Sequence, residues 1–214
     1  MEFIDLTHTI SEDMQVYPGT EPPTLSVPCT VEKDGFKETE IRFYSHTGTH
    51  MDSPAHIFSS GKSLDEFSIE YFYGKGIVVD CRNISYGEKI EESRLKHIEG
   101  NIEKYDFLLF YTGWQEKWGT DEYFEGFPTI SSELADKLNK LVIRGIGIDC
   151  ISIEPITSHK LEIHHKILDS GKVIIENLNN LDQLLDKDFS ICAFPLKFEN
   201  ADGSPVRAVA MIND

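Results

Sequence analysis

Residues 46–56 read His46-Thr-Gly-Thr-His50-Met-Asp52-Ser-Pro-Ala-His56 and contain three of the eight histidines of the chain. The three histidines and the aspartate stand at even positions, so an extended segment would present all four side chains on one face. Neutral imidazole and carboxylate are ligands that suit Zn²⁺ and Mn²⁺. Such groups are costly to bury together unless something pairs with them. The segment therefore predicts a metal site rather than unrelated surface histidines.

This segment must bend if its side chains are to bind one ion. Residues four apart on a straight strand are separated by roughly 13 Å, whereas two ligands of one metal lie only about 4 Å apart. Gly48 permits a bend because it has no Cβ. A helix would also place His46 and His50 on one face, but the threonines, the glycine and the proline of the segment disfavour a helix.

The composition indicates one domain, which we place over residues 1–214. Of the 214 residues 40% are hydrophobic, enough for a sizeable core. Acidic residues outnumber basic ones 37 to 20, and the formal charge of −17 opposes binding to nucleic acid or to an anionic membrane. The N-terminus lacks the pattern of a signal peptide, and no apolar run approaches about 18 residues. We therefore expect a cytoplasmic protein.

The cysteines are scattered and form no Cys-x-x-Cys pair; they are Cys29, Cys81, Cys150 and Cys192. This spacing excludes a zinc knuckle and a dithiol redox motif. Each is expected to be a small apolar residue in or beside a strand. Cys150 is an alternative nucleophile because it follows Asp149 at the end of an apolar run, but a nucleophilic cysteine needs a histidine base, and the sequence provides no local pairing.

Strand patterns outnumber helix patterns along the chain. Strands are predicted over residues 3–10, 24–31, 39–45, 76–80, 106–111, 146–149, 173–176, 189–194 and 206–212. Helices are predicted over 91–98, over 132–141 with Ser131 or Ser132 as N-cap, and over 163–170 with Gly171 at the C′ position. Since single helices interrupt runs of strands, we predict an α/β fold with a mixed sheet rather than a regular βαβ repeat.

A second group of candidate ligands lies in the C-terminal half of the chain. A further histidine cluster comprises His159, His164 and His165. Two apolar strands end at Asp149 and Glu176, and strand-end carboxylates often point into a site, although many only cap a loop. A helix that ends at Gly171, followed by a turn and a strand, could return Glu176 to His164, twelve residues earlier.

The two groups together provide five ligands, one more than a single tetrahedral zinc uses. Two metals that share a carboxylate fit the number better. Asp52 is central in its segment and is the natural bridge, and such a centre would hold a hydroxide between the ions at neutral pH. A purely structural zinc is disfavoured because such sites are usually closed by cysteine-rich ligand sets, and no cysteine lies near these histidines.

These residues resemble a known family, the cyclase-like metal-dependent hydrolases that include bacterial kynurenine formamidase (arylformamidase) and isatin hydrolase. The segment from His46 to His56 is similar to the family hallmark. Other counterparts are Tyr17-Pro-Gly, Tyr111-Thr-Gly-Trp114, Gly147-Ile-Asp149, His164-His-x-Ile-Leu, Glu176-Asn-Leu, Pro195-Leu-Lys and Gly203-Ser-Pro-Val-Arg207-Ala-Val. The resemblance therefore extends over nearly the whole chain.

The resemblance implies a role for each candidate residue. One metal would be bound by His46, His50 and Asp52. The second would be bound by Asp52, His164 and Glu176. His56 would be the catalytic acid/base. His165 is an alternative ligand, although the spacing to Glu176 favours His164 in the family pattern.

An aromatic residue, commonly tryptophan, packs against the substrate ring in formamidases of this family, and here Tyr17 holds that place. Phe58 and Trp114 are further candidates for the pocket wall. The resemblance assigns no role to the remaining histidines, and we expect surface positions for His8, His97 and His159.

The resemblance implies a metal-dependent amide hydrolase of the arylformamidase type, which converts N-formylkynurenine to kynurenine and formate in tryptophan catabolism. Zinc is the expected metal, with manganese as the alternative. Ring opening of a cyclic amide or lactone, as in isatin hydrolase, is a second hypothesis. A third hypothesis is a non-catalytic metal-binding protein, which would predict a broken ligand set or a missing acid/base. The family also implies a homodimer or homotetramer and a swivelling β/β/α domain with a barrel-like core.

Overall fold

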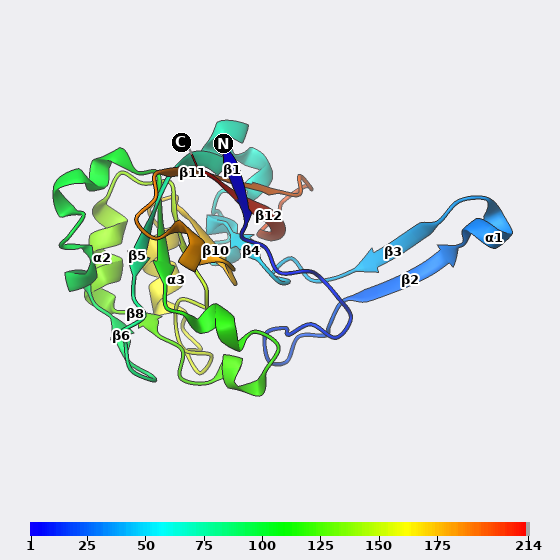
Figure 1. Cartoon of the computed structure of the whole chain (residues 1–214), viewed down its shortest axis with the longest axis horizontal. Coiled ribbons are helices and arrows are strands. Elements are labelled where there is room, and N and C mark those ends of the chain that lie inside the picture. The colour runs from blue at the N-terminus through cyan, green and yellow to red at the C-terminus, as the bar shows by residue number, and fades with distance from the viewer. Residues whose placement is uncertain (213–214) are drawn as a thin grey trace.

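A closed barrel forms the centre of the molecule. The computed structural model describes residues 1–212. Its main sheet has the order β1–β12–β11–β5–β7–β9–β10–β4, and β4 pairs a second time with β12. This additional pairing joins the ends of a seven-stranded ring, and β1 lies outside it against β12 (Figure 1). The predicted α/β fold with a mixed-sheet or barrel core is confirmed.

The strands of this sheet are β1 (Glu2–Asp5), β4 (His50–Asp52), β5 (Tyr73–Asp80), β7 (Phe107–Tyr111), β9 (Gly145–Ile148), β10 (Val173–Glu176), β11 (Phe189–Pro195) and β12 (Gly203–Ile212). The run β5–β7–β9–β10 is parallel. The remaining pairs are antiparallel. β7, β9 and β10 are buried along their whole length, which explains why they read as continuous apolar runs.

Alternate residues of the strands fill two different cores. Phe107 and Leu109 of β7 pack inside the barrel with residues from the other strands of the ring. Leu108 and Phe110 point outward and pack with apolar residues of α2 and α3. This alternation follows from the two-residue period of a strand. It matters for the site because the same alternation turns some residues of each strand inward to the barrel core and leaves others on the outer face.

Two of the three predicted helices are confirmed. α2 (Ser132–Lys140) begins after Ser131, whose side chain accepts a hydrogen bond from Leu134 N at 3.1 Å. α3 (Glu162–Leu168) ends before Gly171, which has a φ of +77°. A third helix, α1 (Val31–Asp34), lies at the tip of an arm and was not predicted.

The helix predicted over 91–98 is wrong, because that stretch forms only a 3₁₀ turn at η4 (Glu92–Leu95). The stretch can bury only Leu95 and Ile98, which is too little apolar surface to stabilise an α-helix of this length. Other 3₁₀ turns are η1 (Pro54–His56), η2 (Leu64–Glu66), η3 (Ile69–Phe72), η5 (Glu99–Lys104), η6 (Trp114–Lys117), η7 (Asp121–Phe124) and η8 (Leu181–Leu184).

Several strand boundaries differ from those predicted. The strand predicted over 3–10 ends at Asp5, after which Thr7 makes only an isolated bridge to Leu178. A small parallel pair, β6 (Lys89–Ile90) and β8 (Thr129–Ile130), was missed because strands of two residues show no periodicity. β4 was missed as a strand for the same reason, since it has only three residues.

An arm projects from the barrel (Figure 1). It comprises β2 (Thr24–Cys29), α1 and β3 (Glu38–Arg42), and the two strands form a separate antiparallel ribbon. None of the residues of β2, α1 and β3 is buried. Isolated two-stranded ribbons are at best marginally stable in water. The arm therefore gains little stability from packing against the rest of its own chain.

The described residues, 1–212, contain no helix with both the length and the apolar character that crossing a bilayer requires.

Gly61 is a test of the close packing around the turn that carries His56. A Cβ on residue 61 would overlap the main chain of Pro54 and lie 2.7 Å from Ala55 N. Because a main chain cannot move aside as a flexible side chain can, we expect Gly61→Ala to lower the free energy of unfolding by about 1–3 kcal/mol in urea denaturation. Gly100→Ala is the control, because its Cβ would meet nothing within 4 Å. Equal losses in both variants would contradict this packing.

Candidate metal centre

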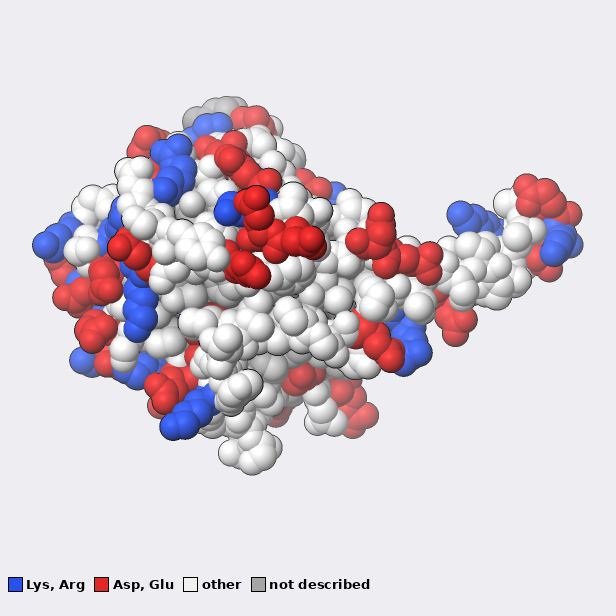
Figure 2. All heavy atoms as spheres, turned by 90° about the horizontal axis from the view of Figure 1, so that it is seen from below, with Lys and Arg blue, Asp and Glu red and all other residues white. Residues whose placement is uncertain are grey.

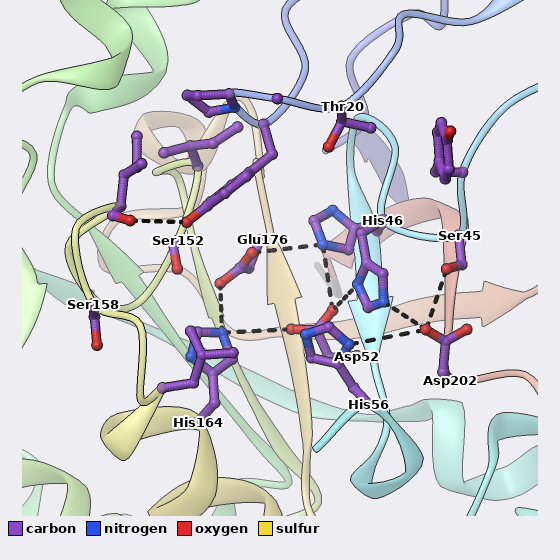
Figure 3. Close-up of a pocket in the computed structure, with 18 of the residues that line it drawn as sticks. Thr20, Ser45, His46, Asp52, His56, Ser152, Ser158, His164, Glu176 and Asp202 are labelled. Atoms are coloured by element: carbon purple, nitrogen blue, oxygen red, sulfur yellow. Dashed lines mark hydrogen bonds and ion pairs between the residues drawn. The ribbon is translucent and has the colours of Figure 1, made fainter.

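A cavity of about 770 Å³ collects the candidate residues of both sequence groups. Its lining includes Tyr17 together with His46, His50, Asp52, His56, His164 and Glu176. It lies on the outer face of β4 and β10, since Met51 and Ile175 point into the barrel between the site residues of those strands. Figure 3 shows the imidazoles and carboxylates converging on one point.

The first group of donors is formed by β4, which carries His50 and Asp52, and by the bent segment before it, which carries His46. Gly48 adopts a φ of +64° and makes the bend that the ligand distances require. His46 Nδ1 lies 2.7 Å from Asp52 Oδ1, and His50 Nε2 lies 3.3 Å from the same oxygen. One donor atom from each of these three residues falls within 4.8 Å of the others. The bend predicted at Gly48 is confirmed.

The second group of donors is brought in by strand pairing and by α3. β10 runs antiparallel to β4 with Glu176 opposite His50. His164 on α3 places Nε2 at 3.4 Å from Glu176 Oε1 and at 3.9 Å from Asp52 Oδ2. The predicted return of Glu176 to His164 is therefore confirmed. Asp52 turns one oxygen to each group, and it is 1% exposed.

The second nitrogen of each imidazole has a partner outside the two donor groups. The pairs are His46 Nε2 with Asp202 Oδ2 (3.0 Å), His50 Nδ1 with Gly48 O (2.9 Å), and His164 Nδ1 with Glu154 Oε1 (2.6 Å). Metal-binding histidines usually donate their other N–H to such a carboxylate or carbonyl, which orients the ring and fixes its tautomer. His50 and His164 thereby present Nε2 to Asp52 and Glu176.

Glu154 also explains how α3 can begin where it does. Leu161 precedes the helix in a left-handed conformation and provides no side-chain cap. Glu154 Oε1 accepts hydrogen bonds from Ile163 N and His164 N at 3.2 and 3.0 Å. One buried carboxylate therefore caps the helix, which a negative charge near its N-terminus also favours, and holds the His164 ring.

The electrostatics of the site favour a cation. Burial opposes charge on His46, yet Asp52 and Asp202 outweigh it and raise the pKa of that imidazole to about 10. Burial acts the same way on His164, and Glu154 and Glu176 raise its pKa to about 10. Protonated imidazoles thus neutralise the buried carboxylates in the metal-free chain. A divalent ion would replace those protons, because metal ligands bind deprotonated, so the donor set fits divalent metal binding.

His56 lies beside the two donor groups and not within them. It ends the η1 turn, its side chain is 27% exposed, and its ring centroid is 4.0 Å from that of His46. Its Nδ1 lies 3.9 Å from Asp202 Oδ2. His46, His56 and Asp202 also bring one donor atom each within 4.8 Å. The imidazole therefore lines the cavity next to His46 and Asp202, with access to solvent.

The wall of the cavity includes one of the three aromatic residues proposed for it. Tyr17 lines the cavity and its hydroxyl donates to Ile156 O at 3.2 Å. Burial, and then the charges of Glu176 and Glu154, raise the pKa of Tyr17, which keeps the phenol neutral. The structure does not support Phe58 and Trp114 as wall residues. Phe58 packs edge-on against His165, and Trp114 lies in the core with Nε1 donating to Tyr123 O.

Sequence reasoning missed Asp202 and Glu154. Asp202 directly precedes the Gly203-Ser-Pro segment, which was the only available signal. Gly203 lets the His46 ring lie against the strand, since a Cβ there would overlap the ring. Glu154 follows the Asp149 strand by a few residues, and nothing in the sequence links it to His164.

The other candidate residues take no part in the donor groups. Asp149 caps a loop, accepting hydrogen bonds from Thr112 N and Oγ1, and burial raises its pKa to about 6. Cys150 is fully buried, and burial raises the pKa of its thiol. His165 is exposed on α3 and its ring contacts Phe58 instead of the donor groups. None of these side chains meets the requirements of a ligand or an activated nucleophile.

The expectation that His8 is a surface residue is wrong. Its side chain is buried and stacks on Trp118 at 3.9 Å between ring centroids, and burial lowers its pKa to about 4. An aromatic neighbour more than a hundred residues away could not be read from the sequence. His97 and His159 are exposed as predicted, although His159 also lines the cavity.

A barrel that carries buried histidine and carboxylate donors on its outer face defines a class of metal-dependent hydrolases, and the comparisons with known proteins agree with this. The family model of the putative cyclases matches residues 4–155. A kynurenine formamidase of Bacillus cereus is 32% identical over 209 residues, covering 97% of this chain and 96% of that protein. The chain belongs to the putative cyclase family.

Solved structures show the same fold. Isatin hydrolase A from Labrenzia aggregata, bound to benzyl benzoate, matches with a TM-score of 0.88 at 26% identity, covering 100% of this chain and 94% of that chain. A predicted metal-dependent hydrolase from Bacillus stearothermophilus matches with a TM-score of 0.76 at 26% identity, covering 98% and 97%.

Proposed function

We propose that this protein is a metal-dependent hydrolase of aryl formamides, and that its substrate is N-formylkynurenine, which it converts to kynurenine and formate. The observation that carries the proposal is the pair of three-residue donor groups that share Asp52, with His56 beside them at the base of one cavity. The kynurenine formamidases that are 32–33% identical over 97% of the chain support this substrate.

Two divalent ions would be held by the two groups, the first by His46, His50 and Asp52 and the second by Asp52, His164 and Glu176. When bound, such ions polarise a carbonyl oxygen and lower the pKa of water, so that a nucleophile is available at neutral pH. Imidazole and carboxylate accept zinc and manganese, and zinc is the ion we propose. Asp52 would be the bridge because its two oxygens face different groups.

His56 would carry the proton that amide hydrolysis has to move. Water adds to the formyl carbon, the C–N bond breaks, and the departing aryl nitrogen must gain a proton. The His56 ring reaches into the cavity beside His46 and is solvent-accessible, so it can take a proton from the attacking water and return it to that nitrogen. Tyr17 would pack its neutral ring against the aryl group of the substrate.

A second candidate reaction is the opening of a cyclic aryl amide. The structural match to isatin hydrolase A at 26% identity favours it, and the chemistry at the carbonyl is the same. The two reactions differ only in whether the amide bond lies in a ring, so the shape of the cavity wall decides between them.

The first experiment separates the two reactions. Protein purified without chelators is expected to contain about two zinc ions per chain and to release formate from N-formylkynurenine faster than it opens isatin, compared as kcat/KM. If the protein binds two metal ions but has the higher kcat/KM for isatin, the ring-opening reaction replaces the proposed one. The absence of bound metal would overturn both reactions.

His56→Ala tests the role of the histidine outside the donor groups. We expect kcat for formate release to fall by about 10²- to 10⁴-fold, because a general acid/base is lost, while zinc content is unchanged. His165→Ala is the matched control, since that imidazole lies on the exposed side of α3. Loss of a metal ion in His56→Ala, with activity retained by the remaining holoenzyme, would make His56 a ligand instead.

We further propose that two copies of the chain associate through the arm. The arm exposes Val27, Val31, Phe36 and Ile41, and a second apolar group of Phe194, Leu196 and Phe198 is exposed at the end of β11 and in the loop after it. Figure 2 shows a mostly uncharged stretch along the arm between charged groups at its base and at its tip. A second copy that covers this stretch would provide the packing that the ribbon lacks within its own chain.

Ile41→Glu tests the arm as the contact. We expect light scattering after size exclusion to give the mass of a dimer or tetramer for the unmodified protein and that of a monomer for the variant, because a buried charge without a partner is costly. Ile69→Glu is the control, since Ile69 is similarly exposed on η3 of the barrel. A monomeric unmodified protein would contradict the proposal.

A further inference from the structure

Asn177 is the hub of a buried hydrogen-bond network behind the first donor group. It directly follows Glu176, is 2% exposed, and has a left-handed φ of +56°, which asparagine tolerates. Its side-chain Nδ2 donates to Gly48 O at 2.8 Å, and its Oδ1 accepts from Tyr123 Oη at 2.8 Å. Its main-chain N donates to Cys150 O at 3.0 Å. Every polar group of this residue is thus engaged.

The bond to Gly48 O matters because His50 uses the same oxygen. His50 Nδ1 donates to Gly48 O at 2.9 Å, and a carbonyl oxygen has two lone pairs, so it can accept from both groups. The bond keeps the proton of His50 on Nδ1 and leaves Nε2 free to face Asp52 and Glu176 at 3.3 and 3.5 Å. The direction of one carbonyl group therefore decides where the ligand nitrogen of His50 points.

His50 differs in this respect from the other two imidazoles. His46 and His164 are held by the carboxylates of Asp202 and Glu154, which carry charge and have their own fixed partners. His50 is held by a main-chain carbonyl in a glycine peptide, and a glycine with a φ of +64° has few steric restraints on its rotation. A second group has to hold that carbonyl, and Asn177 is the residue that does so.

Asn177 is itself held on two sides. Thr49 Oγ1 donates to the main-chain O of Asn177 at 2.6 Å. This bond joins the segment that carries His50 directly to the segment that carries Glu176. The carbonyl of Gly48 can only accept, so Nδ2 faces it and Oδ1 faces the Tyr123 hydroxyl on η7, which lies 2.8 Å from Oδ1 and 3.2 Å from Asp149 O. Tyr123 is fully buried. The amide is thus preorganised and does not depend on a bound ion for its position.

We propose that Asn177 is a positioning residue for the donor group of His46, His50 and Asp52. It acts through Gly48 O, which sets the tautomer and the direction of the His50 imidazole. It has no such link to His164, whose ring is held by Glu154, so its effect falls on one of the two metals. This inference rests on the proposed two-metal site.

Asn177→Asp tests the proposal with almost no change in shape. The variant still accepts from Tyr123, but it turns an oxygen instead of an N–H to Gly48 O and repels it. We expect the affinity for one zinc ion to fall by about 10- to 100-fold, as is usual for the partners of metal ligands, with the affinity for the other ion unchanged. Equilibrium dialysis with Zn²⁺ alone measures both affinities. His50→Ala should lower the affinity for the same zinc ion as Asn177→Asp does.

Two further variants separate positioning from general stability. Asn139→Asp is the control, because Asn139 Nδ2 also donates to a main-chain carbonyl, that of Lys166, and this bond is not part of either donor group. It should lower the melting temperature of the chelator-treated protein without changing either zinc affinity. Asn177→Gly keeps the left-handed backbone accessible and removes both side-chain hydrogen bonds. It should show the same loss of affinity for one zinc ion, and it replaces the aspartate variant if that variant does not fold.

Wild-type affinity for both ions in Asn177→Asp and Asn177→Gly, with only a lower melting temperature, would make the role of Asn177 structural and overturn the inference. Equal weakening of both ions would also overturn it. If the unmodified protein binds no zinc, the proposed function fails together with the inference. If it binds two ions and the variants do the same, only the inference fails.

Discussion

The three-residue strand β4 is the constraint on which the rest of the structure depends. It pairs with β10 on one edge and with β12 on the other, and these pairings close the barrel. The same residues carry the chemistry, because Met51 points into the barrel while His50 and Asp52 point outward. A slip of one residue in this register would exchange those faces. Closure of the fold and assembly of the site are thus one event.

Charge compensation is the second constraint. Asp52 and Glu176 are almost completely buried, and Glu154 is buried beside them. Buried carboxylates are stable only when paired. Without a metal, His46 and His164 provide the pairing, because the neighbouring carboxylates raise the pKa of both imidazoles, and divalent ions would provide it in the active protein. The site is therefore built for cations before any substrate enters, and its outer partners Asp202 and Glu154 orient the His46 and His164 rings.

The separation of the donor groups from the cavity wall follows from the same arrangement. The donor groups stand on strands and on a capped helix, which hold side chains firmly. The cavity wall stands on the loop of Tyr17 and on the loop of Ile156, which are joined by one hydrogen bond. A formamide and a cyclic amide contain the same reacting group, an amide carbonyl. Differences in the loops can therefore change the substrate without disturbing the metal site.

The sequence by itself determined the local chemistry. The even spacing of His46, His50 and Asp52, the bend at Gly48 and the apolar run ending at Glu176 all follow from the chain within a few residues, and long apolar strands and the capped helix α2 were found in the same way. The failures have one physical cause. Two- and three-residue strands have no period to detect, and the short helix predicted over 91–98 lacked the tertiary packing that an α-helix of its length needs.

Only the tertiary structure decided which distant groups became partners. The contacts of His46 with Asp202, of His164 with Glu154, and of Gly48 with Asn177 join segments that barrel closure and loop packing bring together. The stacking of His8 on Trp118 has the same origin. Local sequence patterns report the preferences of neighbouring residues, whereas the energy of a buried polar group depends on whichever atoms the complete fold places beside it.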